Sequence, residues 1–554
     1  MNRNGFCLLV SFLFFLAFSA TLPALADEQP IATLAPVVVT APYQPIPSSP
    51  ASSLTTVISR DQIERSPARD LPQLLRQQVG VHVSDTSGTG RGATVDIRGF
   101  GETGAQNTLV LIDGRRMTQI DSGSNDWAQI PLERVERVEI VRGGSGSVLY
   151  GDNASGGVIH ITTRSGTANP QRSVAISAGS YGAMKTAASA SGALDNLAYR
   201  IDAGYNGIDG YRDNSQTHAN DAALTLDHFV TDQLTLHYRA GHHHDRSGMP
   251  GALTERDLAS GWSRQSSRRP NDFFHADEHY LQVEPELRID PQQQLQVTLS
   301  LQERDTFYSV PGWQQRRHSH SWSMTPQWSL TAPLAGHANQ LHFGVDQQLA
   351  QGDLADSFMG GSTLERNSWA VYVKDSLAVT ERWHIGAGYR RQLTEVIRGG
   401  TSALHDRFDN TAWSIETGYD YQPHSTLYAS IAASFRTPTF DEFSWSEALR
   451  PQRSVDYTVG LRHRFSDTLR LNLDLYQMDV QQELFYDPSG GPWASGINRN
   501  FDGATQRRGL EGRLVHDWST VTLGATLGYV EARIRDGIYS GHRLPAVPRV
   551  TATV

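Results

Sequence analysis

Alternating polarity is the dominant pattern of the chain after about residue 170. Segments of about ten residues or a little longer carry apolar side chains at every second position, with polar side chains between them. Four segments place these apolar residues on one face: Leu234, Leu236, Tyr238 and Ala240; Leu281, Val283, Leu287 and Ile289; Leu295, Val297, Leu299 and Leu301; Leu469, Leu471, Leu473 and Leu475. Strict alternation over this length predicts β-strands with one apolar and one wet face.

The connectors between these segments are alternately short and long. Short turns at 194–196, 231–233 and 422–424 contrast with long polar loops at 245–276 and 438–454. Short turns at one end and long loops at the other are typical of an outer-membrane β-barrel. Aromatic residues at or near strand ends suit the interfacial girdles of such a barrel: Tyr199, Tyr205, Trp369, Tyr372, Trp383 and Trp413. A soluble propeller or solenoid is the alternative, and the sequence has no fixed repeat period to favour it.

A different sequence pattern precedes the predicted barrel. From Val95 to Arg164, three aliphatic or β-branched runs alternate with glycine-rich turns, which predicts short strands joined by tight turns. The segment before it reads as strand, short helix, helix and strand, with Ser59 and Asp70 as helix caps. These features predict one mixed α/β domain over residues 54–168 and a barrel over residues 169–554.

An export signal begins the chain. Arg3 supplies positive charge, Phe6–Phe18 is an apolar run, and Ala24–Ala26 is a small-residue cleavage signature. The apolar run is too short to span a bilayer. Residues 1–26 are therefore predicted to be a signal peptide that is removed on export.

Residues 27–53 form a predicted flexible tether. They are rich in proline, alanine and serine, so they cannot bury enough apolar surface to fold alone. Within them, residues 35–41 read A-P-V-V-V-T-A, a short strand-forming run between two prolines. Such a run suits β-augmentation, in which it pairs with the sheet edge of a partner. The alternative is an ordinary linker that contains a few valines.

Composition narrows the class of protein. The mean hydropathy of −0.41 and the 19% of charged residues exclude a multi-helical membrane protein. The net charge of −10 gives no reason to expect a nucleic-acid partner. The single cysteine, Cys7, lies in the leader, so the mature chain is predicted to carry none. The sequence shows no recognisable spacing of a nucleophile, a base and an orienting residue, which predicts no enzyme activity, no catalytic site and no resident cofactor.

The specific motifs resemble those of TonB-dependent outer-membrane receptors, the family that takes up siderophores, haem or cobalamin. The motifs that resemble the plug domain of that family are L-V-L-I-D-G-R-R at 109–116, R-V-E-I-V-R-G-G at 137–144 and L-Y-G-D-N-A-S-G-G-V-I-H-I-T-T-R at 149–164. Residues 434–443 (S-F-R-T-P-T-F-D-E-F) and 506–512 (Q-R-R-G-L-E-G) are similar to barrel segments of the family. Residues 35–41 are similar to its box for the energy-transducing partner.

The resemblance implies a 22-stranded all-β transmembrane barrel with the mixed α/β plug domain in its lumen. The sequence contains about seventeen complete alternating segments and the start of another at 548–554. A single-chain bacterial barrel needs an even number of strands, so we expect the barrel of residues 169–554 to be incomplete at its C-terminal end. The resemblance also implies a monomer in outer-membrane lipid, with plug and tether facing the periplasm.

The same resemblance implies active import of a scarce metal chelate. A ferric siderophore is the first expectation, haem or cobalamin is the alternative, and a passive porin-like channel is the alternative from another class. The TonB C-terminal domain would bind the box through Pro36, Val37, Val38, Val39, Thr40 and Ala41. A side-use of the loops as an adhesin or a phage or toxin receptor is a further alternative.

Charged residues should position the plug. By resemblance, Arg98 and Arg142 match plug arginines that the family pairs with two barrel glutamates. Glu511 matches one of these glutamates, but Thr458 stands where the second is expected. We therefore expect Arg98 or Arg142 to find another acceptor.

Ligand contacts are expected at the plug apices, the polar turns at 87–91 and 119–126. The residues named for this role are Ser87, Thr89, Arg91, Gln119, Asp121, Asn125 and Asp126. Histidines at 242–244, 318 and 320 could ligate a metal, because alternate residues of a strand share a face. Surface histidines without a ligand are commoner, so no metal site is predicted.

Overall fold

The structure is a computed structural model that describes residues 55–86, 88–117, 120, 125–357, 360–400, 403–443, 446, 449–491 and 496–554. The chain divides into two compact units, residues 1–40 and 41–554, and every described residue belongs to the second. The predicted signal peptide, the tether and the box at 35–41 lie outside the described residues. Among the residues that are described, no helix is long and apolar enough to cross a membrane.

The plug is a small mixed domain. Its main sheet has the order β1 (Thr55–Ser59), β6 (Val135–Arg142), β7 (Gly157–Thr163), β4 (Thr108–Ile112) and β5 (Arg115–Arg116). A separate hairpin joins β2 (Val81–Ser84) to β3 (Thr94–Ile97), and the short helices are α3 (Arg60–Arg65), α4 (Leu71–Arg76), α5 (Gly104–Asn107) and α6 (Ser147–Tyr150). Ser59 and Asp70 occupy the predicted N-cap positions, and Asp70 accepts a hydrogen bond from the Gln73 backbone. Aliphatic side chains of α4, β6 and β7 form one buried core, as the runs predicted.

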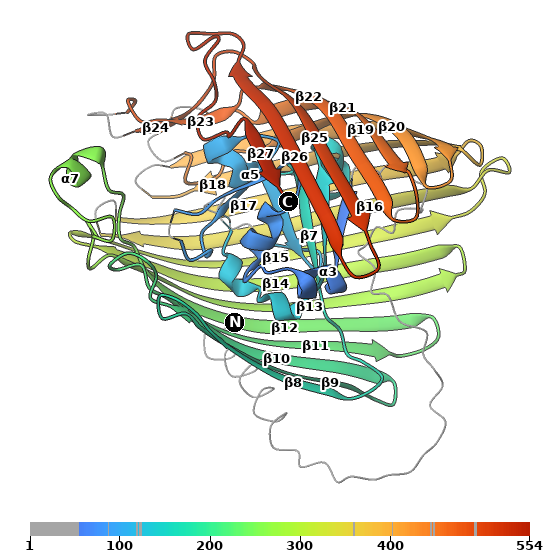
Figure 1. The fold of residues 1–554 in the computed structure, drawn as a ribbon, viewed down its shortest axis with the longest axis horizontal. Coiled ribbons are helices and arrows are strands. Elements are labelled where there is room, and N and C mark those ends of the chain that lie inside the picture. The colour runs from blue at the N-terminus through green and yellow to red at the C-terminus, as the bar shows by residue number, and fades with distance from the viewer. Residues whose placement is uncertain are drawn as a thin grey trace. The chain divides into compact units, whose positions relative to one another are not determined.

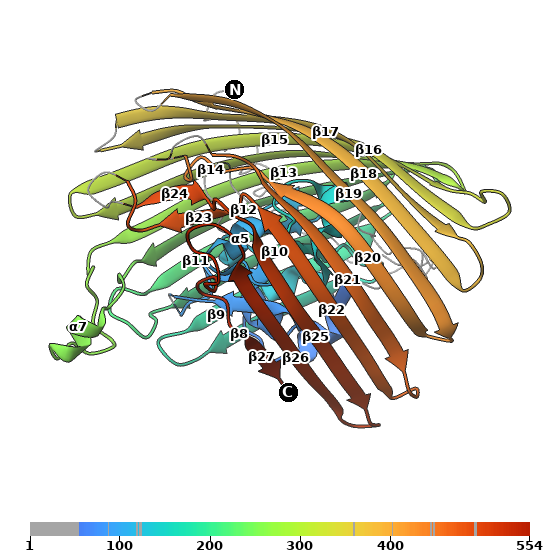
Figure 2. The same ribbon diagram turned by 90° about the horizontal axis from the view of Figure 1, so that it is seen from above.

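The barrel surrounds the plug (Figures 1 and 2). Its strands are β8 (Gln171–Ala178), β9 (Met184–Leu194), β10 (Leu197–Ile208), β11 (Thr217–Phe229), β12 (Leu234–Gly248), β13 (Phe273–Asp290), β14 (Gln293–Val310), β15 (Trp313–Thr331), β16 (Asn339–Asp356), β17 (Gly360–Ala378), β18 (Trp383–Arg398), β19 (Leu404–Gln422), β20 (Ser425–Arg436), β21 (Gln452–Arg464), β22 (Leu469–Gln481), β25 (Thr505–Asp517), β26 (Thr522–Ile534) and β27 (Val550–Thr553). A short hairpin, β23 (Leu484–Asp487) with β24 (Ile497–Asn500), lies between β22 and β25. The prediction of an all-β barrel with an N-terminal plug is confirmed.

Consecutive barrel strands pair antiparallel, and the strand order is that of a closed barrel in which β27 neighbours β8. This order has 18 strands, below the 22 that the resemblance implied. β27 is only 4 residues long, and all 8 residues of β8 are exposed. The first and last strands are thus the shortest strands of the barrel.

Strand alternation separates lumen from exterior as predicted. On β14, Gln302 and Arg304 point into the lumen and contact Glu278 there. The residues between them point outward, so Leu299 and Leu301 belong to an apolar exterior band. The two ends of the barrel also differ. We call the end with the turns at 195–196 and 291–292 the turn end. The end that carries residues 249–272, with α7 (Glu255–Ala259), and residues 437–451 is the loop end.

Candidate functional site: the plug–barrel interface

Arg98 forms a deeply buried charged contact between plug and barrel. Its Nη1 donates to Asp456 Oδ2 at 2.6 Å and to Thr458 Oγ1 at 3.0 Å, and its Nε lies 3.9 Å from Glu511 Oε1. The guanidinium also lies over the Tyr476 ring, 4.3 Å from the centroid. Burial acts to lower the pKa of Arg98, but the two carboxylates outweigh it and raise the pKa, so the cation stays charged. Asp456 is therefore the other acceptor that the threonine at 458 led us to expect.

Arg142 approaches the same cluster from β6. Its Nε lies 3.2 Å from Glu511 Oε2, its Nη2 donates to the Val79 carbonyl at 2.9 Å, and its Nη1 donates to Thr56 Oγ1 at 2.7 Å. Both Glu511 oxygens are buried and accept no hydrogen bond from the described residues, so this carboxylate acts on the arginines through charge alone. We call Arg98, Arg142, Asp456 and Glu511 the arginine lock.

Backbone shape brings Glu511 against the plug. Gly80 has φ of +70°, and a Cβ atom there would collide with the Glu511 carboxylate. A glycine at this position therefore serves both the turn and the close approach of the barrel carboxylate.

Asp96 holds the turn that carries Arg98. Its carboxylate accepts the backbone N–H groups of Phe100 at 2.9 Å and Gly101 at 2.8 Å. Burial raises the pKa of Asp96 to about 6, although these two hydrogen bonds oppose the rise. The turn is thus fixed by a carboxyl group whose protonation changes in mildly acidic solution.

Asp96→Asn is expected to alter how plug stability depends on pH. Because the folded pKa of about 6 exceeds the ordinary aspartate value of 3.8, the contribution of Asp96 is fully present below about pH 4 and is lost as pH rises through 6. Asparagine does not ionise, so the unfolding free energy of the variant should gain on that of the wild type by on the order of 3 kcal/mol between pH 4 and pH 7. Urea unfolding of the plug at several pH values measures this. Asp61→Asn, at a position whose side chain is 77% exposed, is the control. Identical pH profiles for all three chains would refute the assignment.

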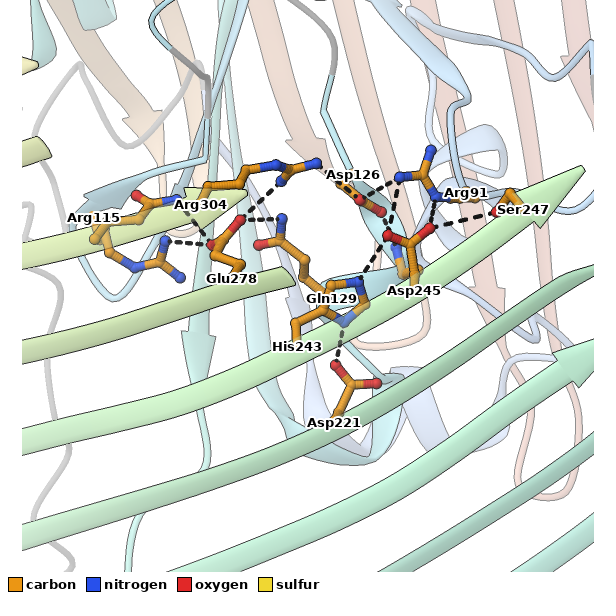
Figure 3. Close-up of polar contacts among 12 residues, drawn as sticks. Arg91, Arg115, Asp126, Gln129, Asp221, His243, Asp245, Ser247, Glu278 and Arg304 are labelled. Atoms are coloured by element: carbon orange, nitrogen blue, oxygen red, sulfur yellow. Dashed lines mark hydrogen bonds and ion pairs between the residues drawn. The ribbon is translucent and has the colours of Figure 1, made fainter. Parts of the chain in front are cut away.

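A second buried network joins plug and barrel near the loop end (Figure 3). Arg91 pairs with Asp245 of β12, donates to Asp126 at 2.8 Å, and lies 4.1 Å from the Phe274 ring centroid. Arg304 of β14 reaches Asp126 at 3.2 Å. Asp126, a plug residue, therefore lies between a plug cation and a barrel cation.

Glu278 of β13 extends this network along the wall. It accepts hydrogen bonds from Gln129 at 2.8 Å and Arg304 at 2.8 Å, and Arg115 approaches it at 3.4 Å (Figure 3). We call Arg91, Arg115, Asp126, Gln129, Asp245, Glu278 and Arg304 the apical network. Positive and negative side chains alternate along the network, and most of them are buried. Removing one of them would therefore leave an unpaired charge in the interior.

A cluster of possible metal ligands overlaps the apical network. Donor atoms of Asp126, His243 and Asp245 lie within 4.8 Å of one another. However, His243 donates through Nδ1 to Asp221 at 2.7 Å, and both carboxylates are already paired with Arg91 (Figure 3). The charge of these carboxylates is thus balanced by arginine, and the cluster holds the plug rather than a cation.

The seven residues predicted to contact the ligand do not form one group in the structure. Ser87, Gln119 and Asp121 lie outside the described residues. Arg91 and Asp126 belong to the apical network and face the barrel wall, and Asn125 is buried beside them. Thr89 is exposed. The ligand role of all seven remains a prediction, and the sequence pattern did not reveal that two of them bind the barrel.

Two family-like motifs meet at a third contact. Asp152, in the plug motif at 149–164, accepts the backbone N–H of Thr437 at 2.9 Å and pairs with Arg366 of β17. Beside it, Arg436 forms a two-pronged ion pair with Glu442 at 2.7 and 2.8 Å, fully buried at the arginine. This pair folds residues 437–443 inward. There Phe440 and Phe443 join a buried apolar cluster, against which Ile120 of the plug packs. The sequence revealed the plug motif at 149–164 and the barrel motif at 434–443, but not that the two contact each other.

Two small cavities lie between the plug and the wall formed by β14–β18. The inner one, of about 110 Å³, is lined mainly by serine, threonine and glutamine, together with Arg116 and Arg390. The second, of about 50 Å³, is lined by Arg116, Arg304 and Arg366. Arg116 donates to the carbonyls of Tyr150 and Asp152 and forms no ion pair with a carboxylate in the described part of the chain. Burial lowers the pKa of Arg116 to about 10, although Asp152 partly opposes this.

Comparison with known proteins agrees with this architecture. Residues 153–554 match the family model described as TonB dependent receptor-like, beta-barrel, and residues 48–158 match that of the TonB-dependent receptor plug domain. The lumen of this barrel is closed by a plug, and buried ion pairs hold the plug in place. The protein is therefore a plugged outer-membrane β-barrel. The chain belongs to the TonB-dependent receptor family, as its motifs suggested.

The named relatives are transporters. The vitamin B12 transporter BtuB of Vibrio vulnificus (strain CMCP6) is 25% identical over 482 residues, which cover 84% of this chain and 73% of the relative. BtuB of Vibrio cholerae serotype O1 (strain M66-2) is 40% identical over 143 residues, 26% of this chain and 22% of that protein. Among solved structures, the ferric citrate transporter FecA in the unliganded form superimposes with a TM-score of 0.79 at 19% identity, over 90% of this chain and 81% of that one. The ferric yersiniabactin receptor FyuA of Yersinia pestis gives 0.77 at 16%, over 93% and 84%. These two identities show the shared fold alone.

Proposed function

We propose that this chain imports a metal chelate across the outer membrane, with energy delivered by TonB. The observation that carries the proposal is the closed lumen. The inner cavity of about 110 Å³ is far below the roughly 300–1,000 Å³ of a site for a drug-sized ligand. A chelate therefore passes only if the plug moves. The arginine lock and the apical network oppose that movement, so an energy source is needed, whereas a passive porin-like channel needs no such plug.

Two cargo classes are supported by different observations. The named sequence relatives are vitamin B12 transporters, one of them 25% identical over 84% of this chain, which favours a corrinoid as the first candidate. The second cavity favours an anionic ferric siderophore, because its lining includes Arg116, which forms no ion pair among the described residues, beside two arginines that are paired with carboxylates, Arg304 and Arg366. Uptake of labelled cobalamin and of a panel of ferric siderophores, each by cells that lack other receptors for it, separates the two classes.

The proposed orientation follows from the two barrel ends. The loop end faces the exterior and receives the chelate above the apical network, while the turn end and the tether face the periplasm. TonB binds residues 35–41 by adding them as a strand to its own sheet. Ligand binding at one end is thereby coupled to force at the other.

Val38→Pro is expected to abolish accumulation while leaving binding of the chelate to cells intact. Proline cannot donate a strand hydrogen bond, so it disrupts the proposed pairing with TonB without altering the barrel. Ile31→Pro, in the tether but outside the box, is the matched control and should accumulate chelate normally. Continued accumulation by Val38→Pro would overturn the box assignment, and loss of surface binding in both variants would point to failed assembly.

A further inference from the structure

Histidines and carboxylates face each other on the exterior of the barrel, away from the plug. β15 carries H-S-H at 318–320 and β14 carries E-R-D at 303–305. The strand register pairs Glu303 with His320 and Asp305 with His318. Residues two apart on a strand share a face, so these four side chains form a two-by-two array. The middle residue of each triplet, Arg304 or Ser319, points to the other face.

The array lies outside the lumen, since Arg304 reaches the plug through the lumen and its two neighbours must point outward. Along β14 the exterior positions that precede it toward the turn end are apolar, ending with Leu299 and Leu301. The array therefore lies at the edge of the apolar band on the loop-end side. None of these four residues belongs to the arginine lock or to the apical network.

The histidine hydrogen bonds orient the ring nitrogens. His318 Nδ1 lies 3.1 Å from Asp305 Oδ1, so it carries the proton of a neutral ring, and its Nε2 bears the lone pair 3.8 Å from Glu303 Oε1. Metal-ligating histidines are commonly held in this way, by a carboxylate on the nitrogen that does not bind the metal. Ligand-type atoms of Glu303, Asp305 and His318 all lie within 4.8 Å of one another.

His320 adds a second imidazole on the same face. Its ring centroid is 6.3 Å from that of His318, and its Nε2 lies 3.0 Å from Gln351 Oε1. The amide of Gln351 donates to Glu365 at 3.2 Å, which sets its oxygen toward His320. His320 therefore donates through Nε2 and carries its lone pair on Nδ1.

We propose that this array is a binding site for a divalent transition-metal ion of the zinc type. His318 Nε2, His320 and the Glu303 carboxylate are the ligands, and Asp305 orients His318. Two imidazoles with one carboxylate suit zinc, nickel, cobalt or copper, whereas magnesium and calcium prefer oxygen ligands alone. The ligand side chains project from the outer face of the strands, so loading of the site does not require the plug to move.

Equilibrium dialysis of the purified full-length protein against Zn²⁺ tests the site. We expect the wild type to bind Zn²⁺ with preference over Mg²⁺ and Ca²⁺, and His318→Gln/His320→Gln to lose that binding. Asp305→Asn should weaken it by about 10–100-fold, the usual effect of removing an orienting partner. His405→Gln is the matched control, because His405 is an exterior histidine paired with a single carboxylate, Glu395, at 2.8 Å.

A Co²⁺ absorption spectrum gives an independent readout. The wild type and His405→Gln should show visible bands of nitrogen-ligated Co²⁺, which the double histidine variant should lack. Heat-dependent gel mobility confirms that each variant is a folded barrel. The proposal fails if the wild type binds no Zn²⁺, if the double variant binds it as well as the wild type, or if Ca²⁺ binds equally well.

Discussion

Asp456→Asn should release the plug at a markedly lower urea concentration than the wild type does. Arg98 is fully buried, and Asp456 is its only hydrogen-bonded carboxylate among the described residues. Neutralising Asp456 leaves the guanidinium with Glu511 at 3.9 Å and with Thr458. Breaking one partner of a buried ion pair costs about 3–5 kcal/mol. With urea slopes of about 1–3 kcal/mol per M, the midpoint of plug unfolding should fall by at least about 1 M.

Asp409→Asn is the matched control for that measurement. Arg391 and Asp409 form a pair of the same length, 2.6 Å, on the exterior of the barrel, with side chains 57% and 49% exposed. Exposed pairs contribute about 0–1 kcal/mol because water already solvates both charges. Plug unfolding can be followed by the conductance of single barrels in a planar bilayer. Equal midpoints for the two variants would mean that the arginine lock does not hold the plug.

The sequence predicted the parts of this structure that depend on local periodicity. Strand alternation indicated which face of β14 is apolar, and glycine-rich turns indicated the compact plug. The arginine lock was partly predictable, since the motifs singled out Arg98, Arg142 and Glu511. The motifs did not single out the fourth residue of the lock, Asp456. It lies two residues before Thr458 on the same strand face, so it reaches the same arginine.

The apical network could not be predicted in the same way. The network depends on which barrel side chains lie opposite Arg91 and Asp126. The register of the barrel strands and the depth of the plug in the lumen set this, and no local sequence pattern encodes it. The run of histidines at 242–244 shows the difficulty. His243 points inward to Asp221, while its neighbours point outward, and periodicity alone leaves the choice of face open.

The contact between the plug and β20 offers a direct way to ask whether the plug must move. Gly144, in the glycine-rich turn after β6, packs against Ser434 of β20. A Cβ atom built at Gly144 would lie 3.1 Å from Ser434 Cβ, slightly inside the 3.5–4.5 Å that disulfides show. A small shift would bring cysteines at these positions into bonding range. No other thiol would interfere, because the only native cysteine is Cys7, in the predicted leader.

The double variant Gly144→Cys/Ser434→Cys should bind chelate but not accumulate it once oxidised, and a reductant should restore accumulation toward the wild-type level. The disulfide joins plug to wall at a point that TonB must separate if the chelate passes between them, whereas surface binding needs no separation. Ser434→Cys alone controls for the loss of the hydroxyl that lies 2.6 Å from Ser454 Oγ. It should accumulate chelate under both conditions. Undiminished accumulation by the oxidised double variant, with the disulfide verified by mass spectrometry, would show that transport leaves this contact closed and that any opening lies elsewhere along the wall.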